Sequence, residues 1–153
     1  MKLTIRQMTQ ADAEEIAAWR YGPPYSFYDA TADEDDLRLL LDAESREGRN
    51  FGVWDDDGTL VGFFEFKLRG ADVELGLGLR PELTGRGLGV EFVEAALAFG
   101  RERFRPETFR LAVATFNRRA IRVYERAGFE PVREYDHATN GGIHRFLEMA
   151  RPA

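Results

Sequence analysis

Three glycines in the run Thr84-Gly85-Arg86-Gly87-Leu88-Gly89 have the spacing of a turn that can bind an anion. A strand-like stretch, residues 73–79, leads into this run, and an amphipathic helix over residues 88–103 follows it. Glycines let backbone N–H groups approach a ligand closely, and the N-terminus of a helix adds a partial positive charge. Arg86 adds a full positive charge within the turn. The run therefore predicts a binding site for a phosphate or pyrophosphate group.

Two common phosphate-binding motifs do not fit this run. The dinucleotide fingerprint G-x-G-x-x-G fails, because its last position falls on Val90 or Phe92. A P-loop needs a lysine before its Ser or Thr, and this segment contains no lysine. Glycine clusters are often plain tight turns, so the surrounding residues must decide whether a ligand binds here.

The strand that precedes the turn supports a ligand site. Side chains alternate along a strand, so residues 73, 75, 77 and 79, all Val or Leu, form one apolar face. The opposite face carries Glu74, Gly76 and Gly78. Two glycines on one face of a strand often mark a bulge or a place where a ligand lies close to the backbone. A carboxylate on that face is a candidate for chemistry.

A second block lies downstream. Residues 109–114 read as a short apolar strand, and Asn117 is a good N-cap for the helix that follows. The apolar positions of this helix include Tyr124. Gly128 ends the helix as a C′ glycine, and Phe129 begins another strand. The block thus predicts a strand, a capped helix and a second strand in succession.

Together the two blocks resemble the GNAT superfamily of acetyltransferases, which use acetyl-CoA. The pyrophosphate loop of that family, Q/R-x-x-G-x-G/A, corresponds to residues 84–89. Thr84 stands where the family has Gln or Arg, so the resemblance leaves the phosphate contacts to the backbone and to Arg86. The second block of the family, an Asn-capped helix with a tyrosine before a Gly-Phe pair, corresponds to Asn117, Tyr124, Gly128 and Phe129.

The resemblance covers almost the whole chain and implies one domain over residues 1–153. The implied fold is α+β, the three-layer GNAT acyl-CoA N-acyltransferase fold, with a mixed, mostly antiparallel sheet flanked by about four helices. The element order that the sequence predicts, β-α-α-β-β-β-α-β-α-β-β, is the order of that fold. In this fold the strands that begin near Val73 and Phe109 splay apart, and the pantetheine arm of the cofactor lies between them.

Local signals place the other elements. Thr9 with Asp12 three residues later resembles a capping box, and Thr31 with Glu34 repeats the signal at a second helix, which should end at Gly48. The turn at residues 55–58 should join two strands as a hairpin. Further strands are predicted at residues 3–8, 51–54, 60–68 and 143–149.

The resemblance implies direct transfer of an acetyl group from acetyl-CoA to a primary amine of a small molecule or a peptide. An amine with a pKa of about 10.4 is protonated at neutral pH, so a base must remove its proton. Glu74, on the glycine-lined face, is the first candidate, and a solvated or salt-bridged strand glutamate is the alternative interpretation. Glu65 on the hairpin is the reserve.

Other catalytic roles follow from the resemblance. The N–H of Leu79, left unpaired by a bulge near Gly78, would bind the oxyanion that develops during transfer. Tyr124 would protonate the departing thiolate, although on spacing alone a core aromatic is the simpler interpretation. Asn117 would contact the cofactor arm, but its capping role also explains it. The implied cofactor-binding residues are Leu77, Leu79, Thr84, Gly85, Arg86, Gly87, Leu88, Gly89 and Asn117.

The acceptor pocket is predicted from residues 19–29, a segment dense in aromatic residues. Two prolines and a glycine exclude a regular helix there, so the segment should be a large loop. Tyr25 and Tyr28 are the candidates to line a substrate cleft. Covering the core and packing in a homodimer are the alternatives for this loop. His137 and His144 read as ordinary strand residues.

Composition excludes several classes of function. The chain has no cysteine, so it forms neither a disulfide nor a thiolate metal site, and its two histidines are too few for a histidine-rich site; we expect no metal. A formal net charge of −6 at pH 7 argues against nucleic-acid binding. No segment approaches the roughly 18 apolar residues of a membrane span, and no apolar signal region is present, so we expect a cytoplasmic protein that binds no membrane.

We therefore expect an acetyl-CoA-dependent N-acetyltransferase without a covalent enzyme intermediate. The alternative from a different class is a non-catalytic module that binds CoA or acyl-CoA, with a regulatory role. Both would bind the cofactor, so only turnover separates them. Glu74 and Tyr124 favour the enzyme.

Overall fold

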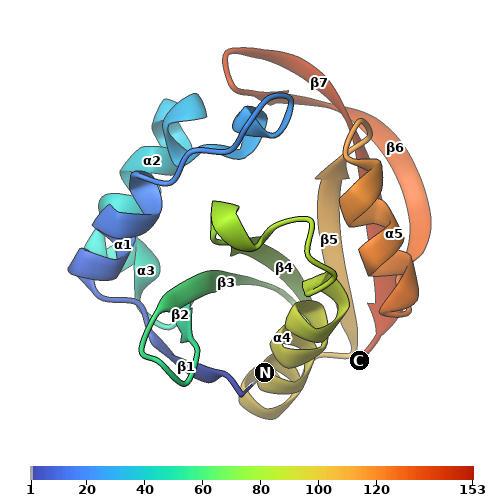
Figure 1. Ribbon diagram of the computed structural model, residues 1–153. Coiled ribbons are helices and arrows are strands. Elements are labelled where there is room, and N and C mark those ends of the chain that lie inside the picture. Colours follow the sequence, from blue (N-terminus) through green and yellow to red (C-terminus); the bar gives the residue numbers. More distant parts are fainter. Residues whose placement is uncertain (1) are drawn as a thin grey trace.

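One mixed sheet organises the computed structural model, which describes residues 2–153 (Figure 1). Its strands are β1 (Thr4–Gln7), β2 (Asn50–Trp54), β3 (Leu60–Arg69), β4 (Asp72–Leu79), β5 (Thr108–Ala114), β6 (Glu130–Thr139) and β7 (Gly142–Pro152). They lie in the order β1-β2-β3-β4-β5-β7-β6. Neighbouring strands are antiparallel except β4 and β5, which run parallel. The predicted mixed, mostly antiparallel sheet is confirmed.

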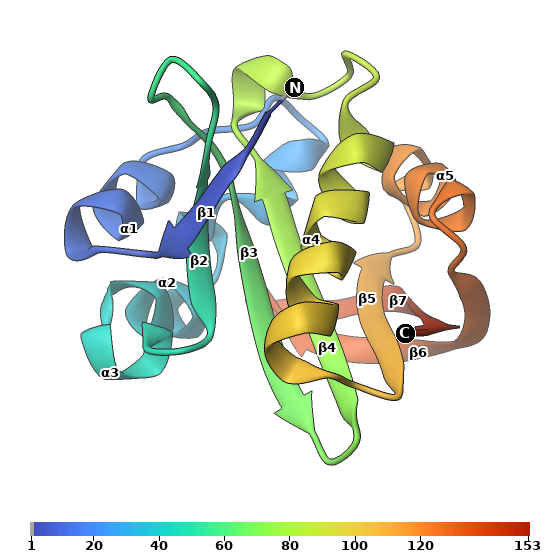
Figure 2. The same cartoon turned by 90° about the horizontal axis from the view of Figure 1, so that it is seen from below.

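Helices cover both faces of this sheet. They are α1 (Gln10–Ala17), α2 (Glu34–Leu41), α3 (Ala43–Arg46), α4 (Gly89–Phe104) and α5 (Arg118–Arg126), with short 3-10 helices at Tyr25–Tyr28, Ala30–Ala32 and Pro81–Leu83. The first three α-helices gather on one side, and α4 and α5 lie on the other (Figures 1 and 2). The element order is the predicted one, with α3 and the 3-10 helices added.

Alternation along β3 divides its side chains between two hydrophobic cores. Phe64 points into the larger core, where its ring centroid lies 4.8 Å from that of Phe92 on α4. Phe63 points to the smaller core, where it lies 6.4 Å from the ring of Trp19. Glu65 is two residues further along the same strand, so it faces the side of α1 and α2 as Phe63 does.

The capping box predicted at Thr9 is confirmed. The Thr9 hydroxyl accepts a hydrogen bond from the N–H of Asp12 at 3.1 Å, and the N–H of Thr9 donates to the Asp12 carboxylate at 3.0 Å. Both residues lie at the first turn of α1, so the capping box depends on no contact outside this helix.

The start and end predicted for the second helix are wrong. Its N-cap is Asp33 rather than Thr31, because residues 30–32 form a 3-10 turn and the Asp33 carboxylate accepts from the N–H of Asp36 at 3.0 Å. The helix ends at Leu41 instead of continuing to residue 48, because the side chain of Asp42 caps the separate short helix α3. The expected long helix is thus two short ones.

The pairing between β4 and β5 stops early. Only three pairs join these strands, and the last is Glu74 with Arg110. Beyond this point β4 remains paired with β3 as far as Leu79, and β5 remains paired with β7 as far as Ala114. The C-terminal parts of β4 and β5 therefore separate, and the chain leaves β4 towards α4 at the open end of the gap (Figure 2).

Candidate active site

The predicted phosphate turn lies between β4 and α4. Gly85 and Gly87 have φ angles of 72° and 78°, in the left-handed region that favours glycine. Leu88 is the N-cap of α4 and makes no side-chain capping bond, so the first N–H groups of the helix have no side-chain partner there. The Thr84 hydroxyl donates to the carbonyl of Pro81 at 2.7 Å. This geometry suits an anion held by backbone donors, with Thr84 bonded inside the loop.

Gly89 has a different reason to be glycine. A Cβ at this position would lie 2.9 Å from Cγ2 of Val123 on α5, closer than side chains approach. A Cβ on Gly87 would meet nothing within 4 Å. Gly89 therefore allows α4 to pack against α5, whereas Gly87 is required by its backbone conformation.

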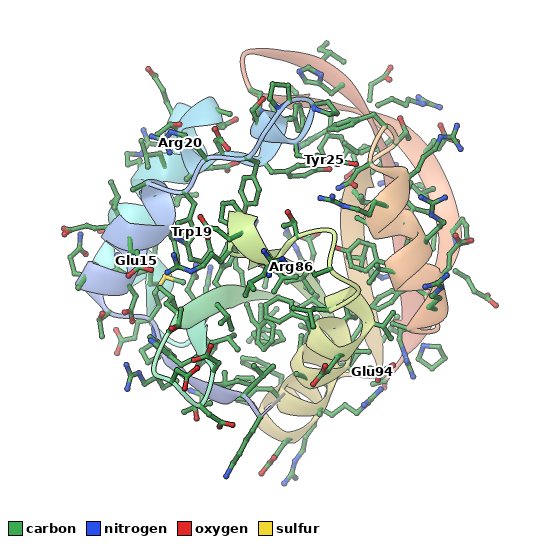
Figure 3. The ribbon with its side chains drawn as sticks, viewed as in Figure 1. Glu15, Trp19, Arg20, Tyr25, Arg86 and Glu94 are labelled. Carbon is green, nitrogen blue, oxygen red and sulfur yellow. The ribbon has the colours of Figure 1, made fainter. Side chains whose placement is uncertain are left out.

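Two arginines border the loop. Arg86 is exposed on the turn itself (Figure 3). Arg119, in the first turn of α5, stacks on Tyr25 with its guanidinium carbon 4.1 Å from the ring centroid. Its Nη1 lies 3.4 Å from the position that a Cβ of Gly85 would take. Sequence reasoning missed Arg119, and the available signal was its place two residues after the cap Asn117.

The edge of β4 that faces the gap carries backbone groups that no strand pairs. The N–H of Arg80 donates to the carbonyl of Val61 at 2.8 Å. Arg80 and every second residue before it in β4 therefore direct their backbone N–H and C=O groups towards β3. The N–H and C=O groups of Leu77 and Leu79 therefore point the other way, where β5 has already separated. An extended chain that contains amides can bind to such an edge as an added strand does.

The side chain of Tyr21 bonds to one of these edge groups, and sequence reasoning did not single it out. Its hydroxyl donates to the carbonyl of Leu79 at 2.6 Å. Burial raises the pKa of Tyr21, and Asp29 and Glu82 raise it further, so the phenol keeps its proton. The carbonyl of Leu79 is thus already bonded, and the N–H of the same residue remains on the gap side.

On the far side of the gap, two tyrosines lie near the end of β5. The N–H of Ala114 donates to the Tyr28 hydroxyl oxygen at 3.2 Å. Burial raises the pKa of Tyr124, and nearby Tyr28 raises it further, so this phenol is protonated at neutral pH. Asn117, beside Tyr28, caps α5 by accepting from the N–H of Ala120 at 3.2 Å. The fold therefore brings Tyr28, Tyr124 and Asn117 together.

A cavity of about 410 Å³ lies on the α1–α2 side of the sheet. Tyr28 lines it, but Tyr25 does not: Tyr25 packs against Phe116, with ring centroids 6.4 Å apart, and lies under Arg119. The aromatic lining of the cavity consists of Trp19, Tyr21, Phe27, Tyr28, Phe63 and Phe146, and its acidic lining consists of Asp29, Asp36 and Glu65.

The two carboxylates considered as bases have different surroundings. Glu65 lines the cavity opposite Gly76 in the β3–β4 register, with its carboxylate 3.5 Å from Nζ of Lys67. Glu74 is absent from the lining; its carboxylate lies 4.0 Å from Nζ of Lys67 and 3.9 Å from the guanidinium of Arg69. Glu74 also stands on the last rung of the β4–β5 pairing, below the gap. Both carboxylates lie near Lys67, and of the two only Glu65 lines the cavity.

A third carboxylate, that of Asp36 on α2, lines the same cavity. Burial raises its pKa; nearby Asp33 and Glu65 also raise it, while Lys67 and His137 lower it. Groups from α2, β3 and β6 thus act on one another across this end of the cavity. His137, read from the sequence as an ordinary strand residue, borders the cavity because the β6–β7 hairpin curves towards α2 (Figure 1).

The turn of that hairpin is tied to the segment before α2. The Asp33 carboxylate accepts from the N–H of Asn140 at 2.9 Å and from the hydroxyl of Thr139 at 3.0 Å. These bonds and the one from the N–H of Asp36 lower the pKa of Asp33 to about 2. The side-chain amide of Asn140 donates to the carbonyl of Phe27 at 2.7 Å. The hairpin turn therefore closes one wall of the cavity.

Two further observations concern metal ligands and membrane spans. Within residues 2–153, no cluster of three or more His, Cys, Asp or Glu side chains is placed to hold a metal ion. Across the same described range, no helix combines the length and the apolar character needed to cross a membrane. The groups available at the gap are backbone donors, arginines, tyrosines and carboxylates.

Sequence comparison gives a family match and one partial relative. Residues 2–130 match the family model described as an acetyltransferase (GNAT) domain. The chain is also 36% identical over 83 residues to the mycothiol acetyltransferase of Propionibacterium freudenreichii subsp. shermanii. That match covers 51% of this chain and 26% of the relative, so the chain spans about a quarter of the length of this curated protein.

Solved structures share the fold. A chimera of spermidine N-acetyltransferase SpeG from Vibrio cholerae and hSSAT superposes with a TM-score of 0.81 at 22% identity, over 99% of this chain and 96% of that chain. An acetyltransferase of the GNAT family from Bacillus anthracis gives a TM-score of 0.79 at 21% identity, over 99% and 95% of the two chains. Spermidine N-acetyltransferase from Vibrio cholerae, in complex with CoA and spermine, gives 0.79 at 22% identity, over 98% and 95%.

The superpositions support the fold, and the family model extends from β1 to the start of β6. The chain belongs to the GNAT acetyltransferase family.

Proposed function

We propose that the protein is an acetyl-CoA-dependent N-acetyltransferase that transfers an acetyl group directly to a primary amine. The observation that carries this proposal is the gap between β4 and β5, whose pairing ends at Glu74 and Arg110. The glycine loop lies at the open end of the gap, and the cavity that contains Glu65 lies on the α1–α2 side of the sheet. A cofactor in the gap would therefore reach from an anion site to an amine site.

The groups along the gap fit two parts of CoA, the diphosphate and the pantetheine arm. The N–H groups of residues 84–89 suit the diphosphate, with Arg86 and Arg119 beside them. The edge groups of Leu77 and Leu79 suit the amides of the pantetheine arm. When bound, acetyl-CoA supplies an acetyl group activated as a thioester. The chain contains no cysteine, which agrees with direct transfer to the amine.

We propose that Glu65, in place of Glu74, removes the proton from the acceptor amine. Glu65 lines the cavity, whereas Glu74 lies between Lys67 and Arg69 beside the paired part of β4. Lys67 is 3.5 Å from Glu65 and can hold its carboxylate in position. A carboxylate so placed can take a proton directly or through one water molecule.

Tyr124 is the residue that we propose to protonate the departing thiolate. Burial raises the pKa of Tyr124, and Tyr28 is near enough to raise it further, so the hydroxyl stays protonated. Tyr124→Phe should lower kcat by about 10- to 100-fold, at the low end of general acid effects, while CoA affinity by calorimetry holds. An unchanged kcat between about pH 6 and 9 would show that the hydroxyl has only a structural role.

The acceptor is proposed to be a cationic amine. Three carboxylates and six aromatic side chains line the cavity, against two cationic side chains, Arg49 and Lys67, so carboxylates and aromatic rings, which attract cations, prevail in the lining. Two of the similar structures are named as spermidine N-acetyltransferases or chimeras of one, and one of these was solved with CoA and spermine. Polyamines are therefore the first acceptors to test.

The decisive test measures free thiol released from acetyl-CoA in the presence of polyamines, aminoglycosides, amino acids and N-terminal peptides. Mass spectrometry of the acceptor should show one added acetyl group, and a reaction without acceptor is the control. CoA binding by calorimetry without turnover in any mixture would favour the non-catalytic binding module instead. Absence of CoA binding would reject both. A cytoplasmic location, a single domain over residues 1–153 and a homodimer stay predictions from the sequence.

A further inference from the structure

Two tyrosines from the segment between α1 and α2 bond to backbone groups on opposite sides of the gap. The Tyr21 hydroxyl donates to the carbonyl of Leu79, on the edge of β4, at 2.6 Å. The Tyr28 hydroxyl oxygen accepts from the N–H of Ala114, at the end of β5, at 3.2 Å. Both bonds come from side chains that belong to neither strand.

The bonded backbone groups lie beyond the last pair between β4 and β5. Leu79 and Ala114 are the last residues of their strands, and the pairing between these strands has already ended at Glu74 and Arg110. Backbone groups at partly buried positions need partners, which are usually supplied by the next strand. A phenol side chain reaches further than a backbone amide, so a tyrosine can satisfy its strand without drawing the other strand in.

The segment that carries these tyrosines is itself held in place. The N–H of Tyr21 donates to the Asp29 carboxylate at 2.9 Å. The ring of Tyr28 packs edge-on against Phe27, with centroids 5.3 Å apart. Phe27 in turn accepts through its carbonyl from the side chain of Asn140 in the β6–β7 turn. Each hydroxyl therefore has a defined position from which to bind its strand.

We propose that Tyr21 and Tyr28 form a brace, a pair of positioning residues that hold the open ends of β4 and β5 at the spacing that the pantetheine arm of the cofactor requires. The inference rests on the proposed function. Both side chains also line the acceptor cavity, so the brace sets the wall of the cavity and the width of the gap together.

The brace acts on one half of CoA. Its two bonds end on Leu79 and Ala114, which flank the gap, and neither bond involves the loop at residues 84–89. Loss of a brace hydroxyl should therefore weaken the binding of the pantetheine half and leave the nucleotide half unaffected. A general loss of structure would weaken both.

The experiment compares Tyr21→Phe and Tyr28→Phe, each of which removes one oxygen and keeps the ring. Calorimetry measures Kd for CoA and for adenosine 3′,5′-bisphosphate, a probe that lacks the pantetheine arm. CoA should bind about 5- to 10-fold more weakly to each variant, the loss of roughly one hydrogen bond, and the bisphosphate should bind within about twofold of wild type. Tyr135→Phe, in the β6–β7 hairpin, is the matched control and should change neither Kd.

Hydrogen exchange gives a second measurement that does not depend on ligand. The amide of Ala114 should exchange faster in Tyr28→Phe than in wild type, and the same amide should be little changed in Tyr21→Phe. Folded variants that bind CoA as wild type does would overturn the brace, and so would an equal weakening of CoA and bisphosphate. Failure of the wild-type protein to bind CoA would reject the proposed function, and the brace with it.

Discussion

The cofactor side and the acceptor side of the site consist of different kinds of chemical group. On the cofactor side the main groups are backbone N–H and C=O groups from one continuous stretch, from β4 through the glycine loop into α4. On the acceptor side the groups are side chains from separate elements, such as Asp36 of α2, Glu65 of β3 and His137 of β6. A site made by contiguous backbone leaves a local pattern in the sequence, whereas a cavity lined by side chains depends on how distant elements pack.

The largest effect is expected on the acceptor side, from a variant that removes the proposed base. Glu65→Gln keeps the size of the side chain and removes the base, so kcat/KM for the amine should fall about 100-fold near pH 7. The loss should shrink as pH rises towards the pKa of the amine, about 10, because more of the amine then arrives neutral. The measurement is the pH profile of kcat/KM from about pH 6 to 10.

Glu74→Gln is the matched control for that experiment, since it changes the same chemical group on the neighbouring strand. Its pH profile should run parallel to that of wild type, because Glu74 lies between Lys67 and Arg69. A loss at low pH in Glu74→Gln, with a parallel profile in Glu65→Gln, would reverse the assignment of the base.

The next effect tests the cofactor side through its backbone. Gly87→Val forces a branched side chain into a φ of 78°, so CoA should bind about 10- to 50-fold more weakly, as strain of roughly 1–3 kcal/mol distorts the loop. Gly58→Val is the control, because Gly58 has a φ of 77° in the β2–β3 turn and equally open space. Both variants should lose thermal stability, and only the first should lose affinity by calorimetry. Equal affinities would reject the loop as the phosphate site.

A smaller effect tests Arg119, a side chain that the tertiary structure places beside the glycine loop. Arg119→Ala should weaken CoA binding by about fivefold at low salt and by less at high salt, because a partly exposed charge is screened. Arg122→Ala removes an exposed charge from the same helix and should have little effect. Tyr25→Leu should reproduce part of the loss, since the ring supports the guanidinium. Identical salt dependence in Arg119→Ala and Arg122→Ala would remove Arg119 from the site.

The smallest effect concerns the tie between the hairpin and α2. The pKa of Asp33 is lowered from 3.8 to about 2, so the folded state gains stability from the ionised form above pH 3.8 and loses it as pH falls towards 2. Asp33→Asn should destabilise the protein by about 1 kcal/mol at pH 7, and its difference from wild type should shrink as the pH falls through about 2. Denaturant unfolding at several pH values measures this. A difference independent of pH would mean that the charge of Asp33 contributes nothing.

Predictions from the sequence succeeded where the determinants are close together in the chain. Thr9 and Asp12 form the predicted capping box because both partners stand within one turn. The box at Thr31 failed, although it has the same spacing, because the Asp33 carboxylate caps α2 and also binds the β6–β7 turn. A residue fixed by a distant hairpin cannot be identified from its neighbours alone.

The two candidate bases show the same limit at the site. Alternation put Glu74 on the glycine-lined face of β4 but left the direction of Glu65 open. The β3–β4 register puts both on one face, since Lys67 lies opposite Glu74 and near Glu65. What alternation cannot provide is the length of the β4–β5 pairing, which leaves Glu74 beside the paired strands and Glu65 beside the cavity. That length depends on contacts with β5, which follows the whole of α4.

Glycine spacing, capping residues and alternation act over a few residues, so the family, the order of the elements and the glycine turn were predictable from the sequence. Only the tertiary structure decided which carboxylate reaches the cavity, that Arg119 borders the loop and that Tyr21 and Tyr28 bond to the two sides of the gap. These relations join residues far apart in the chain. Their physical cause is the way the sheet twists and the helices pack, and no local pattern encodes the distance between two such side chains.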